Sequence, residues 1–227
     1  MTSPLSGLIT QCLAAAADPR TAAEMQRYMK TRMPFLGVRA PIAQRIVRET
    51  VREAGTTQWE DFHAAAKDLW EAAVHREQWY AAQQLTGYRA CIGRIELLAL
   101  YDRMVVDGAW WDIVDNCHRR FGALLREHRD QIDPLLRSWA VHPNHWKRRS
   151  AIIAQLSAKT DTDVGLLEAA ILPNLAERDF FLRKAIGWAL REYAKTEPEW
   201  VRAFVARNEA QLSGLSRREA LKNLPVR

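Results

Sequence analysis

A short segment near the middle of the chain combines indole rings with a carboxylate at helical spacing. It reads Ala109-Trp-Trp-Asp-Ile-Val-Asp-Asn-Cys-His-Arg-Arg120. Trp111 and Asp115 are four residues apart and therefore share one face of a helix, whereas Trp110 lies on another. An aromatic face beside a carboxylate can hold a cation, or a group that becomes cationic during a reaction. The alternative is a core tryptophan beside a capping or ion-paired aspartate.

Three consecutive basic residues, Lys147, Arg148 and Arg149, form a second candidate. On a helix they fan over most of its circumference, so at least one should face any concave surface. Arginine forks match phosphate geometry. A solvated helix N-terminus is the alternative, but positive charge there opposes the helix dipole, which favours a functional use.

The third candidate segment reads Phe180-Phe-Leu-Arg-Lys-Ala-Ile-Gly-Trp-Ala-Leu-Arg-Glu-Tyr193. Lys184 and Trp188 share one helix face, and Ile186 belongs to an aliphatic stripe that can reach the core. Gly187 inside a helix costs about 1 kcal/mol relative to alanine. We expect a glycine there where another backbone or a ligand must approach closely.

Helices must position these residues, because helical periodicity dominates the chain. Two Ser/Thr-x-x-Glu patterns, at Thr57 and Ser216, predict capping boxes at helix starts. No alternating strand or hairpin turn is found, so the expected fold is all-α, with about ten to twelve helices. Besides the helix opening at Thr57, the predicted helical ranges are 5–16, 41–55, 76–90, 94–106, 110–125, 131–141, 146–158, 163–175, 179–195 and 198–210.

These helices repeat along the chain. The segment from Trp146 to Ile152 aligns with Phe180 to Ile186 at a shift of 34 residues, and aromatic residues recur upstream at similar intervals. Stacked helix pairs of this length are typical of a HEAT-like or TPR-like solenoid, whose curvature builds a concave surface. No linker rich in Gly, Ser or Pro is present, so one domain is expected over residues 1–227.

The charge distribution suits a polyanionic partner. The chain has 227 residues and a formal net charge of +6. Residues 1–110 hold 13 Lys and Arg against 12 Asp and Glu, whereas residues 111–227 hold 20 against 15. The excess therefore gathers in the half that carries all three candidate segments, and the expected concave surface is basic. Nine Trp outnumber the six Phe and the five Tyr.

Several classes of protein are excluded by the sequence. No apolar run is long enough to span a membrane, and the N-terminus lacks the features of a signal peptide. Cys12, Cys91 and Cys117 are too widely spaced for a disulfide framework or a zinc site, so a reducing cytoplasm is expected. His142 and His145 have no carboxylate or cysteine partners nearby in the sequence, so no metal site is expected.

The strings WWDxVD, WxRR-A-I and FFxRKAIGWALREYAK together resemble the AlkD-like DNA alkylation-repair glycosylases. The segment Tyr28-Met-Lys-Thr-Arg-Met-Pro-Phe-Leu-Gly-Val38 is similar to an N-terminal motif of the same family. The resemblance runs in order from about residue 20 to about residue 210. It implies an all-α fold of HEAT-like repeats, which agrees with the periodicity found in the sequence itself.

The resemblance also implies roles for single residues. The catalytic aspartate of the family falls on Asp115, and its two active-site tryptophans fall on Trp111 and Trp188. A DNA-binding arginine falls on Arg149, with Arg148 as a one-residue alternative. The remaining residues expected to bind DNA are Lys147, Lys184 and Tyr28, the last being a motif tyrosine near the site.

The activity implied by the resemblance is hydrolysis of the N-glycosidic bond of cationic N3- or N7-alkylated purines in duplex DNA. A carboxylate and two π faces would stabilise the positive charge that develops on the sugar. The implied enzyme needs no cofactor, acts as a monomer in a bacterial cytoplasm, and leaves an abasic site without cutting the strand. The alternatives are a non-catalytic binder of distorted or branched DNA on the same fold, and a helical-repeat scaffold that binds protein.

Overall fold

The computed structural model describes residues 3–225, and this part of the chain is all-helical, without a strand. The prediction of an all-α fold is therefore confirmed. The first helices and 3-10 turns are α1 (Pro4–Ala15), α2 (Pro19–Met29), α3 (Ala40–Ala54), α4 (Trp59–Glu71), α5 (Arg76–Leu85), η1 (Arg89–Cys91) and η2 (Ile95–Leu97). They are followed by α6 (Leu98–Gly108), α7 (Trp111–Val114), η3 (Asp115–Cys117), α8 (His118–Glu127), α9 (Arg129–Ala140), α10 (His145–Ile153), η4 (Lys159–Asp161), α11 (Val164–Ile171), η5 (Leu172–Asn174), α12 (Phe180–Tyr193), α13 (Pro198–Arg207) and α14 (Gly214–Leu221).

The helices form two compact units. The first unit ends at Leu100 and the second begins at Tyr101, so the boundary lies inside α6. Each unit has its own buried apolar core. The expectation of one functional domain over the whole chain stays a prediction.

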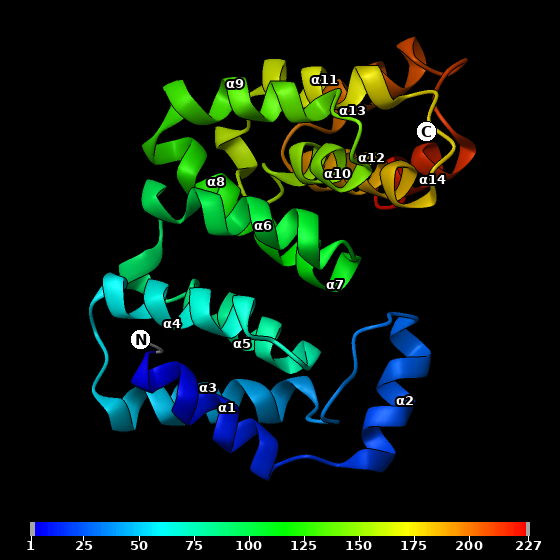
Figure 1. The fold of residues 1–227 in the computed structure, drawn as a ribbon. Helices are drawn as coiled ribbons and strands as arrows, with labels where there is room; N and C mark the ends of the chain where they lie inside the picture. Colours follow the sequence, from blue (N-terminus) through cyan, green and yellow to red (C-terminus); the bar gives the residue numbers. More distant parts are fainter. Residues whose placement is uncertain (1–2, 226–227) are drawn as a thin grey trace. The chain divides into compact units, whose positions relative to one another are not determined.

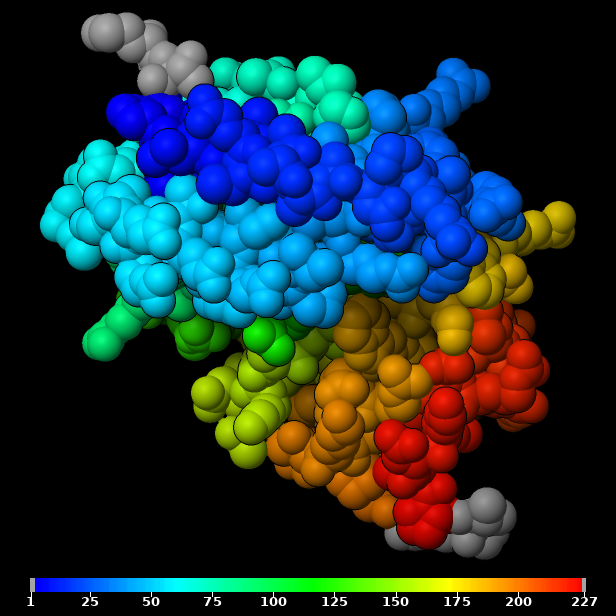
Figure 2. Space-filling view, turned by 90° about the horizontal axis from the view of Figure 1, so that it is seen from below, coloured from blue at the N-terminus to red at the C-terminus, as the bar shows by residue number. Residues whose placement is uncertain are grey.

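In the first unit, α1, α3, α4 and α5 pack against one another. Helices α1 and α3 lie side by side, and Figure 2 shows them as adjacent blue and lighter blue bands on one face. Their facing sides bury Ile9 and Leu13 of α1 and Val47 of α3. These residues follow the three- and four-residue spacing from which the two helices are predicted.

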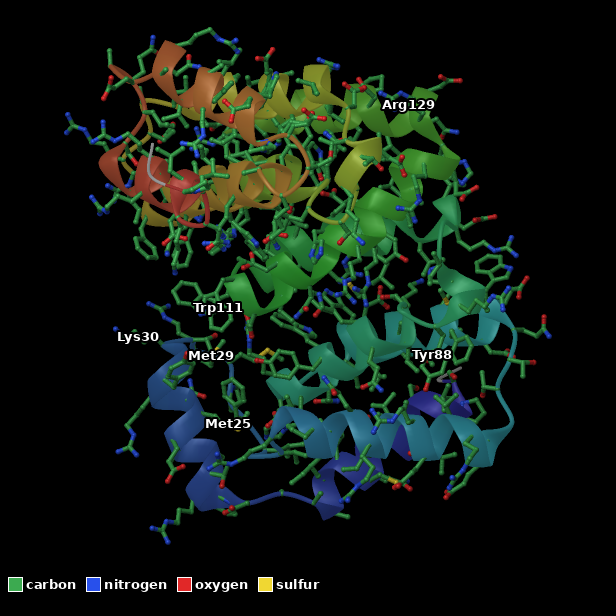
Figure 3. The ribbon with its side chains drawn as sticks, turned by 180° about the vertical axis from the view of Figure 1, so that it is seen from behind. Met25, Met29, Lys30, Tyr88, Trp111 and Arg129 are labelled. Atoms are coloured by element: carbon green, nitrogen blue, oxygen red, sulfur yellow. The ribbon has the colours of Figure 1, made fainter. Side chains whose placement is uncertain are left out.

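Helix α2 is not among the predicted helices, although its start carries a signal. The side chain of Asp18 accepts two backbone N–H groups of the first turn, and Pro19 occupies the first helical position. The helix ends where Lys30 adopts a left-handed conformation, with φ of 52°. Met29 and Lys30 are labelled at this end in Figure 3, and Tyr28 belongs to the same turn.

The second unit stacks helix pairs in two layers. In Figure 1, α9, α11 and α13 form one layer and α10, α12 and α14 form the other. Within the α10 layer, α10 packs on α12 and α12 packs on α14. Trp146 and Phe180, which the sequence repeat aligns, lie in the first turns of α10 and α12. This arrangement supports the predicted helical repeat, whereas the basic concave surface stays a prediction.

The two predicted capping boxes are wrong. Helix α4 begins two residues after the expected cap, at residue 59, without a side-chain cap. The N-cap of α14 is Ser213, whose Oγ accepts the N–H of Ser216 at 3.0 Å. Ser216 is buried inside the helix, and its hydroxyl donates to the carbonyl of Arg183 at 2.9 Å. Glu219 is therefore available for a role in packing against α12.

Neither a membrane-spanning helix nor a cluster of metal ligands is found within residues 3–225. The longest helix, α3, has 15 residues, and a span needs about 20 apolar ones. Two histidines considered in the sequence have other contacts. Nδ1 of His142 accepts the N–H of Asn144 at 3.0 Å, and the ring of His145 packs on that of Trp146.

Candidate active site

The shortest α-helix positions Trp111 and Asp115. Trp110 precedes α7 in an extended conformation, and Ala109 before it has φ of 30°, so the chain turns sharply into this single turn of helix. Ile113 and Val114 point into the core. The opposite side carries Trp111, which is 37% exposed and labelled in Figure 3, and Asp115, the next residue on that face.

Arg149 holds the Asp115 carboxylate by two parallel hydrogen bonds. Its Nε donates to Oδ1 at 2.6 Å and its Nη2 donates to Oδ2 at 2.7 Å. The third nitrogen, Nη1, donates to the carbonyl oxygen of Phe181. Arg149 is only 4% exposed, so α10 delivers a buried guanidinium to the carboxylate. A bidentate pair of this kind fixes both the position and the plane of the acid.

His118 supports the same aspartate from the backbone side. Its Nδ1 lies 2.6 Å from the carbonyl oxygen of Asp115, and its Nε2 lies 3.3 Å from Oγ of Ser157. Because a carbonyl oxygen can only accept, Nδ1 carries the hydrogen and Nε2 of the neutral ring is the acceptor. Burial lowers the pKa of His118 below its ordinary value, which favours this neutral form.

Helix α12 supplies Trp188, whose ring centroid lies 6.3 Å from that of His118. The preceding residue, Gly187, is buried against α14. A Cβ at Gly187 would lie 2.5 Å from Cβ of Glu219 and 3.0 Å from the carbonyl oxygen of Ser216. The prediction that this glycine admits another backbone is confirmed, and the backbone is that of α14.

The close approach of α14 brings Glu219 to the same place. Its Oε1 accepts from Nζ of Lys184 at 3.0 Å, and its Oε2 accepts from Nη1 of Arg191. The hydrogen bond from Lys184 is the main reason why the pKa of Glu219 is lowered. Sequence reasoning assigned Glu219 to a capping box and missed this role. The available signal was the helical glycine at 187, which marks a close contact.

These side chains surround an open pocket of about 290 Å³ within the second unit. The pocket brings together five of the site residues predicted from the sequence, together with Glu219 and Arg191, which were not predicted to lie there. It is lined by Trp111, Asp115, Arg149, Phe180, Phe181, Lys184, Trp188, Arg191 and Glu219. A carboxylate fixed beside two tryptophans in an open pocket is suited to stabilising a cation.

Comparison with known proteins agrees with this geometry. A family model described as DNA alkylation repair enzyme matches residues 9–224. The chain belongs to this family. A solved structure titled "Predicted DNA alkylation repair enzyme from Enterococcus faecalis" is 32% identical, with a TM-score of 0.79 over 93% of this chain and 98% of that chain. No curated protein matches the chain.

Two of the basic residues that we expect to bind DNA in this repair enzyme do not line the pocket. Nζ of Lys147 lies 2.7 Å from Oδ1 of Asp102 and packs over the ring of Trp139. Nη1 of Arg148 donates to Oε1 of Glu177 at 2.6 Å. Both cations are paired with carboxylates distant in the sequence, so most of the positive charge expected on several sides of this helix is neutralised. Their contacts with DNA stay predictions.

The N-terminal motif of the family lies in the first unit. Tyr28, in the last turn of α2, is 75% exposed. The loop that follows is held by Glu77, whose carboxylate accepts the backbone N–H groups of Leu36, Gly37 and Val38 at 2.9 to 3.1 Å. The hydrogen bonds to Glu77 therefore explain the conformation of the loop part of this motif. The role of Tyr28 in DNA binding stays a prediction.

An aromatic cluster behind the pocket accounts for part of the tryptophan excess. The ring of Trp110 packs edge-on against Trp146 and Phe181, with centroids 6.0 and 5.3 Å apart. The guanidinium carbon of Arg149 lies 5.9 Å from the centre of the Phe181 ring. The neighbouring residues 110 and 111 thus have different surroundings. The ring of Trp110, which precedes α7 in an extended conformation, packs in this cluster, whereas Trp111 lines the pocket.

Proposed function

We propose that this member of the DNA alkylation repair family is a glycosylase that hydrolyses the N-glycosidic bond of cationic N3- and N7-alkylated purines in duplex DNA. The products would be a free base, such as 3-methyladenine or 7-methylguanine, and an abasic site. The observation that carries the proposal is the fixed carboxylate of Asp115 in an open pocket beside Trp111 and Trp188.

The pocket chemistry matches the demands of this reaction. Alkylation at N3 or N7 already makes the base a cationic leaving group, so no general acid is needed to protonate it. As the bond breaks, positive charge develops on the deoxyribose, and a carboxylate held in place stabilises it without reorganising. The carboxylate can also orient the attacking water. Arg149 uses two of the roughly four acceptor sites of Asp115, which leaves others for sugar or water.

The two tryptophans would pack on the sugar and backbone of the damaged nucleotide. Their π faces attract a cation, which adds to the effect of the carboxylate. The pocket contains one lysine, Lys184, and its ammonium group is paired with Glu219. A hydrolytic reaction that leaves the strand intact therefore fits better than attack by a lysine amine.

DNA binding by this enzyme would be electrostatic and would involve both units. Within the proposal, Arg148, Lys147 and Lys184 of the second unit and Tyr28 of the first are the residues expected at the DNA. Arg149, the remaining residue expected there from the sequence, would act mainly by holding Asp115, to which two of its nitrogens donate. Because the pocket lies within one chain, a monomer suffices for the reaction. The expected setting is the bacterial cytoplasm, and no cofactor takes part.

The test is to incubate methylated duplex DNA with the protein and with its Asp115→Asn variant. The wild-type protein should release 7-methylguanine and 3-methyladenine, measured by mass spectrometry, and leave abasic sites that break only on treatment with alkali. Loss of the fixed charge should lower the single-turnover rate by about 10²- to 10³-fold. Binding to undamaged duplex should survive in this variant, so the loss of rate reports on the chemical step.

Asp133→Asn is the matched control. Asp133 also accepts from an arginine Nε, that of Arg137 at 2.5 Å, and its side chain is 18% exposed against 20% for Asp115. It lies on α9, outside the pocket, so its substitution should leave the rate unchanged. Tight DNA binding by the wild-type protein without release of any base would favour the non-catalytic DNA binder instead.

A further inference from the structure

Glu219 joins two cations at the pocket. Lys184 and Arg191 both come from α12, each one turn or less from Trp188, and Glu219 comes from α14. The carboxylate receives one cation on each oxygen, so both its oxygens are occupied. Gly187 makes this possible, because only a residue without a side chain lets α14 lie this close to α12.

The charges lining the pocket depend on this arrangement. The lining contains three cationic and two anionic side chains. Arg149 is paired with Asp115, and Glu219 is the acid paired with the remaining two cations. Without Glu219, Lys184 and Arg191 would face the pocket without a carboxylate partner, and its lining would gain one unit of positive charge.

An added positive charge in the pocket lining would strengthen DNA binding but slow cleavage of the glycosidic bond. Free cations beside the DNA backbone would strengthen binding to any duplex, because each neutralised phosphate releases counterions. The same cations would repel an alkylated base, which is positively charged, and the sugar on which positive charge develops. A pocket for a cationic lesion must therefore limit its own positive charge.

We propose that Glu219 is a specificity-determining residue, which neutralises Lys184 and Arg191 so that the pocket accepts a cationic nucleotide and binds undamaged DNA only loosely. The inference rests on the proposed glycosylase activity. It assigns Glu219 no contact with the reacting atoms, since the carboxylate acts through the two cations it holds.

The test compares wild type with Glu219→Gln in two assays. Affinity for an undamaged duplex, measured across a range of salt concentrations, should rise about tenfold at low salt, with a log–log slope steeper by about one. Single-turnover release of 7-methylguanine at saturating enzyme should fall about tenfold, because the extra positive charge opposes the transition state. Opposite changes in binding and in cleavage are the signature of the proposal.

Glu168→Gln is the matched control for charge. Glu168 also pairs with an arginine, Arg207 at 3.1 Å, but it lies on α11 in the other helix layer and does not line the pocket. Removing its charge changes the net charge of the chain equally, so both assays should give wild-type values. Equal tightening of DNA binding in both variants would attribute the effect to net charge and overturn the role of Glu219.

A purely structural role for Glu219 predicts a different result. Disturbed packing of α14 would lower DNA binding and cleavage together, and that outcome would also overturn the proposal. The double variant Glu219→Gln with Lys184→Gln restores the original net charge of the lining, so it should recover much of the lost cleavage rate. If Glu219→Gln does not fold, Arg191→Gln decides: it lowers the positive charge of the lining by one unit, so it should weaken binding of undamaged duplex and raise the single-turnover cleavage rate. A fall in both binding and cleavage would overturn the proposal.

The outcomes separate this inference from the proposed function. If wild type releases no alkylated base, the glycosylase proposal fails, and the inference fails with it. If wild type cleaves and Glu219→Gln binds and cleaves like wild type, only the inference is overturned.

Discussion

Glu77 in the first unit and Asp115 in the second are carboxylates whose two oxygens are both engaged, yet their surroundings differ. Glu77 is fully buried and accepts three consecutive backbone N–H groups from the loop at residues 36–38. Asp115 accepts from the side chain of Arg149 and remains partly exposed at an open pocket.

The difference separates a structural carboxylate from one that can act on a ligand. Backbone amides that surround a buried carboxylate fix the chain and leave no access for another molecule. A single arginine fork occupies one edge of the acid and leaves acceptor sites for a substrate or water. Engagement of both oxygens of an acid therefore does not by itself indicate a structural role, because the type of donor and the access to the acid decide.

The largest expected effect concerns the arginine fork. In Arg149→Lys, one ammonium group cannot make two parallel bonds to Asp115, so the carboxylate loses its fixed plane. We expect the single-turnover release of 7-methylguanine to fall about 100-fold. A lysine would still serve as a point contact for phosphate, so a near-normal rate would favour the sequence prediction that Arg149 binds DNA over a role at Asp115.

Arg137→Lys is the control for this variant. Arg137 also contacts one aspartate, Asp133, through Nε and Nη2, but on α9 away from the pocket. Its substitution should leave the cleavage rate unchanged. A comparable loss of rate in both variants would mean that lysine at such positions disturbs the fold rather than the site.

The next largest effect concerns Glu77, the carboxylate with a structural role. Glu77→Gln removes the charge that three backbone N–H groups share and presents an amide group where an acceptor is needed. We expect the free energy of unfolding, measured by urea titration, to fall by about 2–3 kcal/mol. Glu24→Gln removes an exposed partner of Arg39 in the same unit and should cost less than about 0.5 kcal/mol.

If Glu77→Gln lowered the free energy of unfolding no more than Glu24→Gln does, the structural role assigned to Glu77 would be contradicted. The two carboxylates should also differ in which quantity changes. Substitution of Asp115 should lower cleavage far more than stability, whereas substitution of Glu77 should lower stability first. If both variants lost stability and activity in the same proportion, the distinction between them would break down.

Local spacing predicted a substantial part of this site. Trp111 and Asp115 line the same pocket, as their four-residue spacing predicts. Trp110 precedes the helix in an extended conformation, and its ring packs on Trp146 instead. The close contact at Gly187 was also predictable, since a helical glycine is costly unless something approaches it. Most helices in both layers of the second unit were predicted from the three- and four-residue spacing of their apolar residues, which is also a local signal.

Partners distant in the sequence could not be predicted in the same way. Arg149 pairs with a residue 34 positions earlier, Lys147 pairs with Asp102 of α6, and Arg148 pairs with Glu177 in the loop before α12. Spacing shows which charges share a face but not which opposite charge meets them after folding. Glu219 was missed for this reason, since its partners on α12 lie 28 and 35 residues away. Helix α2 is a different case, because its Asp-Pro start was visible and overlooked.

The smallest expected effect again compares the two units, through a partly buried histidine in each. Burial is the first cause that lowers the pKa of His118 in the second unit and of His63 in the first. Below about pH 6.5 the unfolded chain takes up a proton before the folded chain does, so both residues should make stability fall as pH decreases. The fall should level off below the folded-state pKa.

His118→Asn keeps a donor for the Asp115 carbonyl but does not titrate. The drop in melting temperature between pH 7.5 and pH 5.5 should therefore become smaller by about 2 °C. His63→Asn should reduce the drop in the same direction. Only the change at His118 should also alter the rate of base release, because His118 contacts the backbone of Asp115 and His63 does not lie at the pocket. If the melting temperature of His118→Asn fell more steeply with decreasing pH than that of wild type, folding would favour the charged ring. If both histidine variants changed the rate of base release equally, His118 would have no particular role in supporting Asp115.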